Sequence, residues 1–239
     1  MATFYPMKAL ILLGVLVLFG PLSVAQESAG HRPPKGPEQW EKEIAAFELE
    51  DARTPGSENP VVFVGSSSIR LWKTLKEDFP KHRVLNRGFG GSYITDTVHF
   101  ADRLVIRHKP SFIVVYTGGN DLGAGRTPQQ VFEAYKELVG KIRAALPDTP
   151  IAYISIAGNP KRWYQVTEVI QTNALIEAHT KTNPGLLFID VFHPMLAGDG
   201  KPRPEIFSKD RLHMNAEGYK LWTEIVGRHL PPQRAAVRP

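Results

Sequence analysis

The chain has 239 residues, of which 42% are hydrophobic and 22% charged, with a formal net charge of +5. This length suits one α/β domain with a sizeable core, and a modest, dispersed positive charge argues against a nucleic-acid partner. The chain contains no cysteine, which excludes disulfides, thiolate metal sites and a cysteine nucleophile. No metal-ligand spacing such as His-x-x-x-His appears either, so we expect neither a metal nor a cofactor.

The first 25 residues are typical of a secretory signal peptide. Lys8 supplies the positive charge, Ala9–Gly20 forms the apolar stretch, and Ser23-Val24-Ala25 places small residues before Gln26. Spanning a bilayer takes about 20 apolar residues, so this stretch is too short for a membrane anchor. We expect cleavage after Ala25, a secreted or periplasmic protein, and no stable membrane insertion once the signal is removed.

Polar segments rich in proline border the predicted domain. Residues 26–37 and 231–239 are expected to be a flexible lead-in and a flexible tail. The folded domain is expected to cover residues 38–230.

Short apolar runs alternate with segments of helical periodicity inside this domain. The runs are near-continuously apolar, as in strands buried on both faces of a parallel sheet. The five predicted strands are Val61–Val64, Val84–Asn86, Phe112–Thr117, Ile151–Ile156 and Leu186–Val191. Apolar residues spaced by three or four predict helices around Trp40–Phe47, after Pro128, from Val166 and from Tyr219. The apolar stripe of the third helix consists of Val166, Val169, Ile170, Ala174 and Ile176.

This alternation predicts a doubly wound α/β fold. We expect a three-layer α/β/α sandwich, flavodoxin-like, with a five-stranded and mainly parallel sheet. In such sheets ligands bind beyond the carboxyl ends of the strands, so the residues that follow each strand are the candidates for chemistry.

Three strands end in segments with two interpretations each. Ser67 lies in Gly65-Ser66-Ser67-Ser68, either as an exposed nucleophile on a tight turn or as a helix cap. Asn86–Ser92 contains three glycines, which suit an oxyanion or phosphate site as well as an ordinary loop. Asn120 follows Gly118-Gly119 and either donates a side-chain hydrogen bond into a cleft or belongs to a common turn.

Two Asp-x-x-His segments lie near the end of the chain. On a helical turn, residues three apart share one side, so Asp210 is expected to reach the imidazole of His213 and orient it. Asp190 and His193 have the same spacing, but Asp190 falls at the end of a predicted strand. We therefore expect these two side chains to point apart and to be structural or peripheral.

Four of these segments, in this order, resemble the four sequence blocks of the SGNH (GDSL-like) hydrolase family. The resemblance covers residues 58–230 and implies that Ser67 is the nucleophile, His213 the base and Asp210 its partner. It also implies an oxyanion hole formed by Ser67, Gly91 and Asn120. Ser66 is a departure, because the family usually has aspartate there, and we expect hydrogen bonding in that loop to differ.

The resemblance implies a serine esterase that cleaves carboxylic esters. Because the base must be neutral, activity is expected to rise through about pH 6.5–7, the range of an ordinary histidine. No long apolar lid segment is evident, which favours short or water-soluble acyl substrates. An acetyl-glycan esterase, a lysophospholipase and a non-catalytic ligand-binding protein remain as alternatives. Tyr93, Arg162 and Trp163 are weaker candidates for binding a small-molecule or glycan ester, and the sequence leaves the oligomeric state open.

Overall fold

The computed structural model describes residue 1 and residues 36–53 and 59–232. The predicted signal peptide, residues 26–35 of the predicted lead-in and residues 233–239 of the predicted tail lie outside the described residues.

The described part of the chain contains one sheet of five strands, all parallel. The strands are β1 (Val61–Gly65), β2 (Val84–Gly88), β3 (Phe112–Tyr116), β4 (Ile151–Ile154) and β5 (Leu186–Ile189). Their order across the sheet is β2-β1-β3-β4-β5, which is the flavodoxin-like order of a doubly wound fold. The predicted three-layer α/β/α class and all five predicted strands are therefore confirmed.

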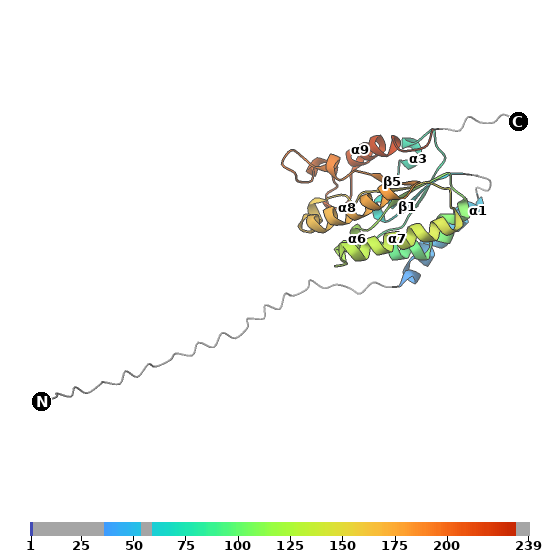
Figure 1. Cartoon of the computed structure of the whole chain (residues 1–239). Coiled ribbons are helices and arrows are strands. Elements are labelled where there is room, and N and C mark those ends of the chain that lie inside the picture. The colour runs from blue at the N-terminus through green and yellow to red at the C-terminus, as the bar shows by residue number, and fades with distance from the viewer. Residues whose placement is uncertain (2–35, 54–58, 233–239) are drawn as a thin grey trace. The chain divides into compact units, whose positions relative to one another are not determined.

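Helices cover both faces of this sheet (Figure 1). The α-helices are α1 (Glu41–Arg53), α2 (Ser67–Arg70), α3 (Leu75–Asp78), α4 (Ile94–His99), α5 (Ala101–Leu104), α6 (Gly119–Gly123), α7 (Pro128–Ala145), α8 (Val166–Thr182) and α9 (Ala216–Gly227). Short 3-10 helices are η1 (Pro37–Trp40), η2 (Ile106–His108), η3 (Pro160–Gln165), η4 (His193–Met195) and η5 (Pro204–Ile206).

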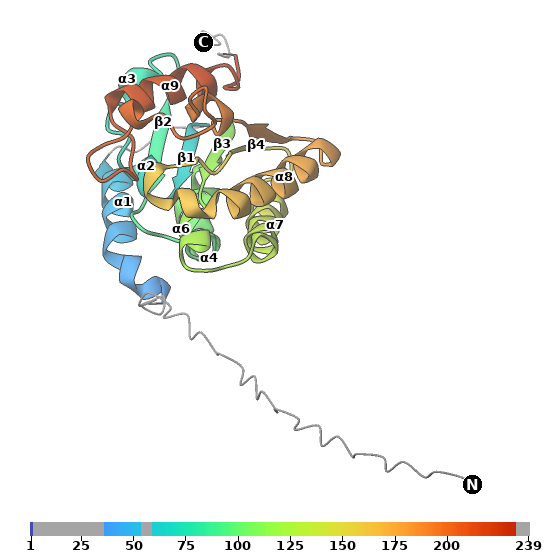
Figure 2. The same cartoon turned by 90° about the vertical axis from the view of Figure 1, so that its left-hand side faces the viewer.

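Alternate residues of each strand supply the two halves of the core. In β1, Val62 and Val64 belong to the cluster that packs against α1, α4, α5, α7 and α8. Val61 and Phe63 belong to the cluster on the other face, with α2, α3 and α9. Figures 1 and 2 show α9 and α3 on one side of the sheet and α7 on the other. The near-continuous apolar strands of the sequence follow from this burial on both faces.

The predicted buried stripe of α8 is wrong in part. Ile170 is 50% exposed and Ala174 is also exposed, whereas the buried face includes the polar residues Thr172, Asn173 and Thr180. These polar side chains are hydrogen bonded to the backbone: Asn173, for example, accepts a hydrogen bond from Ile156 N–H and donates one to the Ile156 carbonyl. Periodicity of apolar residues cannot detect a buried face built in this way.

The direction in which successive strands are added to the sheet reverses between β1 and β3. β1 connects outward to β2, and β3 connects outward to β4 and β5, so the loops after β1 and β3 diverge from one another. Within the described ranges, no helix has the length and apolar character needed to cross a bilayer.

Candidate active site

Ser67 is presented by a sharp turn at the end of β1. Gly65 has a φ of 144°, and a Cβ built on it would lie 1.9 Å from the carbonyl oxygen of Tyr116 on the neighbouring strand. Only glycine tolerates both this φ and this close approach. The Ser66 N–H then donates to the same Tyr116 carbonyl at 3.0 Å, and α2 begins at Ser67 itself.

His213 and Asp210 lie on a hydrogen-bonded turn before α9. The predicted helical turn is wrong, because Arg211 has a φ of 58°, in the left-handed region. Ser208 N–H donates to the His213 carbonyl at 2.8 Å, and Arg211 N–H donates to the Ser208 carbonyl at 2.9 Å. The turn nevertheless brings the two side chains together, because the Asp210 carboxylate folds back over its own loop.

A continuous hydrogen-bonded chain joins the three side chains. His213 Nδ1 lies 2.6 Å from Asp210 Oδ2, and His213 Nε2 lies 2.9 Å from Ser67 Oγ. The carboxylate holds the proton on Nδ1, which leaves Nε2 free to accept the hydroxyl proton of Ser67.

The charge of Asp210 is stabilised by the turn that carries it. Partial burial by itself raises the pKa of Asp210, but hydrogen bonds from the His213 and Leu212 N–H groups, together with the His213 ring, lower it to about 2. Both N–H groups donate to Asp210 Oδ1 at 3.0 Å. The carboxylate is therefore ionised at neutral pH.

The side-chain amide of Asn120 lies on the opposite side of the same cavity. Its Nδ2 donates to the carbonyl of Ser92 at 3.1 Å, and its Oδ1 accepts from Arg162 Nη1 at 3.1 Å. One N–H of the amide remains for a ligand. Gly91 precedes Ser92 and has a φ of 76°, and neither its N–H nor that of Ser67 donates to another described residue.

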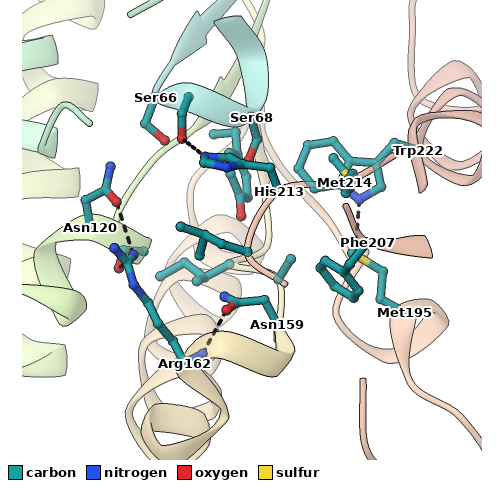
Figure 3. A pocket seen from close by; sticks show the side chains of 16 residues that line it. Ser66, Ser68, Asn120, Asn159, Arg162, Met195, Phe207, His213, Met214 and Trp222 are labelled. Atoms are coloured by element: carbon teal, nitrogen blue, oxygen red, sulfur yellow. Dashed lines mark hydrogen bonds between the residues drawn. The ribbon is translucent and has the colours of Figure 1, made fainter. Parts of the chain in front are cut away.

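The cavity beside Ser67 is small, with a volume of about 40 Å³. One water-sized group occupies roughly 10–15 Å³, so the cavity holds about three such groups. Figure 3 shows His213 on one side of it, Asn120 and Arg162 on another, and the apolar side chains of Met195, Phe207 and Trp222 beyond. Polar groups that donate hydrogen bonds thus converge on a space with an apolar wall.

Two of the weaker candidates do not line this cavity. The ring of Tyr93 lies under the guanidinium of Arg126, with 5.3 Å between the ring centroid and Cζ. Trp163 stacks on Phe192 and lines a neighbouring groove instead. Arg162 does line the cavity, although its Nη1 already donates hydrogen bonds to the Gly119 carbonyl and to Asn120 Oδ1.

Asp190 and His193 are hydrogen bonded, so the expectation that their side chains point apart is wrong. His193 Nδ1 lies 2.7 Å from Asp190 Oδ2, because the chain turns immediately after β5. His193 is 78% exposed and is not among the residues that line the cavity.

Sequence reasoning missed asparagines that hold the site in place. Asn86 Nδ2 donates to the Ile69 carbonyl at 2.7 Å and so ties the end of β2 to the helix that begins at Ser67. Asn159 Oδ1 accepts from Arg162 N–H at 2.9 Å. The signal present in the sequence was an asparagine at or near the carboxyl end of a strand, which by itself also fits an ordinary turn.

Asp121, next to Asn120, is buried beneath the site. Its carboxylate accepts from Ile94 N–H at 3.2 Å, and Arg126 Nη1 lies 3.3 Å away. Burial raises the pKa of Asp121 to about 7, although Arg126 and the Ile94 N–H both oppose this rise. No group of three or more potential metal ligands occurs among the described residues.

The sequence and the fold match known proteins. The family profile for GDSL-like lipases and acylhydrolases matches residues 58–221, a range that contains Ser67, Asn120, Asp210 and His213. None of the curated proteins matches the chain significantly.

Three solved structures illustrate the similarity of fold. A GDSL-like lipase from Bacteroides thetaiotaomicron is 22% identical, with a TM-score of 0.66 over 81% of this chain and 96% of the other. An acetylxylan esterase from Geobacillus stearothermophilus is 15% identical, with a TM-score of 0.61 over 77% and 99%. A carbohydrate esterase of family 3 from Talaromyces cellulolyticus is 14% identical, with a TM-score of 0.57 over 72% and 96%.

Proposed function

The chain belongs to the GDSL-like lipase/acylhydrolase family, whose members hydrolyse esters, and we propose that it is a serine esterase that releases short acyl groups. Ser67 is the proposed nucleophile, His213 the general base and Asp210 the residue that orients His213. The observation that carries this proposal is the unbroken hydrogen-bonded chain from Asp210 through His213 to Ser67.

The proposed reaction begins when Ser67 Oγ attacks the ester carbonyl. His213 Nε2 takes the hydroxyl proton, and the resulting imidazolium is stabilised by the ionised Asp210. His213 then returns the proton to the departing alcohol, which leaves an acyl group on Ser67. Water, activated by the same histidine, attacks this acyl-enzyme and releases the carboxylic acid.

The proposed oxyanion hole consists of the free N–H of the Asn120 amide and the backbone N–H groups of Ser67 and Gly91. Donors aimed at the developing negative charge stabilise the tetrahedral intermediate, and the loss of one donor typically lowers kcat by about 10²–10³. The assignment of Gly91 is supported by its unengaged N–H and by its position beside Ser92, to which Asn120 is hydrogen bonded.

The size of the cavity supports a short acyl group. A volume of about 40 Å³ suits the carbonyl oxygen, carbonyl carbon and methyl group of an acetyl ester. Ile156, Phe207 and Trp222 border the cavity and are nearly fully buried, so they favour an acetyl group over a chain of eight carbons.

The first test is hydrolysis of p-nitrophenyl acetate, butyrate and octanoate by the wild type and by Ser67→Ala and His213→Ala. We expect both variants to lose at least about 10³-fold in kcat, and acetate to be preferred over octanoate by more than about tenfold. His193→Ala is the matched control: it removes a histidine paired with an aspartate in the same way but exposed and not lining the cavity, so it should retain wild-type activity. Undiminished turnover by Ser67→Ala would exclude the proposed nucleophile.

A second candidate function, deacetylation of a glycan, is favoured by the groove next to the cavity. This groove has a volume of about 400 Å³, and Trp163, Lys201 and Arg211 are among its lining residues. Trp163 and Arg211 line the groove, whereas their chain neighbours Arg162 and Leu212 line the cavity, so both loops border both spaces. A hydrogen bond from Lys161 N–H to the Arg211 carbonyl, at 3.0 Å, joins the two loops. An aromatic ring beside charged hydrogen-bonding groups is a surface that binds sugar rings.

This candidate is tested by measuring acetate release from acetylated xylo-oligosaccharides. Trp163→Ala should raise KM for the oligosaccharides several-fold and leave p-nitrophenyl acetate, which is too small to reach the groove, unaffected. Equal effects of Trp163→Ala on both substrates would count against a glycan as the substrate. So would a release of fatty acid from a lysophospholipid that is faster than the release of acetate from the oligosaccharides.

A further inference from the structure

Arg162 connects two loops of the site without contacting either Ser67 or His213. It lies in η3, where its backbone departs from helical geometry with a φ of −117° and a ψ of 27°. The Asn159 side chain accepts the Arg162 N–H at 2.9 Å and so holds the chain at this point (Figure 3). The guanidinium reaches across to α6, where Nη1 donates to the Gly119 carbonyl at 3.0 Å and to Asn120 Oδ1 at 3.1 Å.

The guanidinium of Arg162 packs against Gly123, which has no side chain. A Cβ built on Gly123 would lie 2.9 Å from Arg162 Cζ, so any larger residue there would displace the arginine. The side chain is partly buried and makes no ion pair with another described residue. Its hydrogen-bonding capacity is therefore directed toward the loop that follows β3.

These contacts determine which way the Asn120 amide faces. Oδ1 accepts from Arg162, and Nδ2 donates to the Ser92 carbonyl. Rotation of the amide by 180° would place Nδ2 against the cationic Nη1 and Oδ1 against the Ser92 carbonyl oxygen. Both contacts would then be repulsive, so the observed orientation is strongly preferred.

We propose that Arg162 is a positioning residue that holds the Asn120 amide so that its remaining N–H faces the reacting carbonyl. The inference rests on the proposed function, in which Asn120 supplies one donor of the oxyanion hole. Without Arg162, only the Ser92 carbonyl selects the orientation, and the amide populates rotamers that turn Oδ1 toward the oxyanion. A charge-assisted hydrogen bond to Oδ1 also polarises the amide, which strengthens the N–H as a donor.

A double-mutant cycle tests whether Arg162 acts through Asn120. Arg162→Met should lower kcat for p-nitrophenyl acetate by about 10- to 100-fold with little change in KM, a smaller loss than that of Asn120→Ala. Arg162→Lys, which keeps the charge and one donor, should recover part of this loss. In the Asn120→Ala background, Arg162→Met should cost less than about threefold, because the group it positions is absent.

Two other outcomes would overturn the inference. An equal loss in both backgrounds would mean that Arg162 acts independently of Asn120. A raised KM with unchanged kcat would mean that it binds substrate directly. Arg143→Met is the matched control, since Arg143 also donates to backbone carbonyls, those of Pro147 and Pro184, but at the opposite end of the sheet. It should change thermal stability and leave kcat unchanged.

A readout that needs no activity separates this inference from the proposed function. The side-chain amide signals of Asn120 in an NMR spectrum of ¹⁵N-labelled protein should shift and broaden in Arg162→Met, because the amide gains rotamers. Unchanged amide signals would refute the positioning role even if Ser67 proves to be the nucleophile. If Ser67→Ala retains activity, the proposed function fails, while the NMR result still reports on Asn120.

Discussion

Asp210 and Asp190 each fold back onto a histidine three residues later, with nearly the same distances. What distinguishes them is the partner of the second ring nitrogen. His213 Nε2 meets Ser67 Oγ, whereas His193 is 78% exposed and lies outside the cavity. A hydrogen-bonded carboxylate–histidine pair thus forms within its own turn, and the tertiary structure decides whether the second ring nitrogen faces a serine hydroxyl.

The buried carboxyl group of Asp121 makes the stability of the protein depend on pH. Burial raises its pKa from 3.8 to about 7, so between these values the folded state keeps a proton that the unfolded state releases. The free energy of unfolding must therefore fall as the pH rises through this range. The full effect is about 4 kcal/mol, of which about 2–3 kcal/mol falls between pH 5 and pH 8.

Asp121→Asn removes this titration, and it isolates the effect when compared with the wild type. Urea unfolding at pH 5 and pH 8 should show that the wild type loses about 2–3 kcal/mol relative to the variant as the pH rises. Parallel stability curves for the two proteins across this range would show that Asp121 is ionised throughout.

At the scale of elements, the junction between β1 and α2 depends on Gly65. Alanine at this position would combine a φ of 144° with a Cβ only 1.9 Å from the Tyr116 carbonyl oxygen. Because that oxygen belongs to a neighbouring buried strand, it cannot move aside as a flexible side chain would. Gly65→Ala should therefore cost more than about 3 kcal/mol of stability.

Gly140 in α7 is the matched control for this substitution. It is exposed, and a Cβ built on it meets nothing within 4 Å. Gly140→Ala should raise stability by about 0.5–1 kcal/mol, because alanine favours a helix interior. Thermal unfolding of both variants checks the pair, and a Gly65→Ala protein as stable as the wild type would contradict the strained turn.

The strands were predictable, and the turns were not, for a physical reason. A strand buried on both faces must be apolar along its length, so Phe112–Tyr116 can be read from the sequence directly. The turn of Asp210–His213 instead depends on the left-handed backbone of Arg211 and on two backbone hydrogen bonds that involve Ser208. Neither feature produces a periodic pattern in the sequence. The buried polar face of α8 escaped prediction because Asn173 is satisfied by the backbone of a distant strand end.

At the scale of the whole molecule, the sheet order brings the pieces of the site together. Ser67 follows β1, Asn120 follows β3, Arg162 follows β4, and His213 precedes α9, yet all four line one cavity. The segments that follow parallel strands all lie at the carboxyl edge of the sheet, where the diverging loops after β1 and β3 leave a crevice. The contact between Arg162 and Asn120 was beyond prediction, because it joins loops 42 residues apart through one side chain.

The most direct test of the central claim is to map the site of reaction with a fluorophosphonate, which forms a stable adduct with an activated serine. Mass spectrometry of the digested protein should place the phosphonate on Ser67, and the Ser67→Ala variant should remain unlabelled. Labelling of Ser66 or Ser68 in the wild type, or undiminished labelling of Ser67→Ala, would contradict the assignment of Ser67 as the nucleophile.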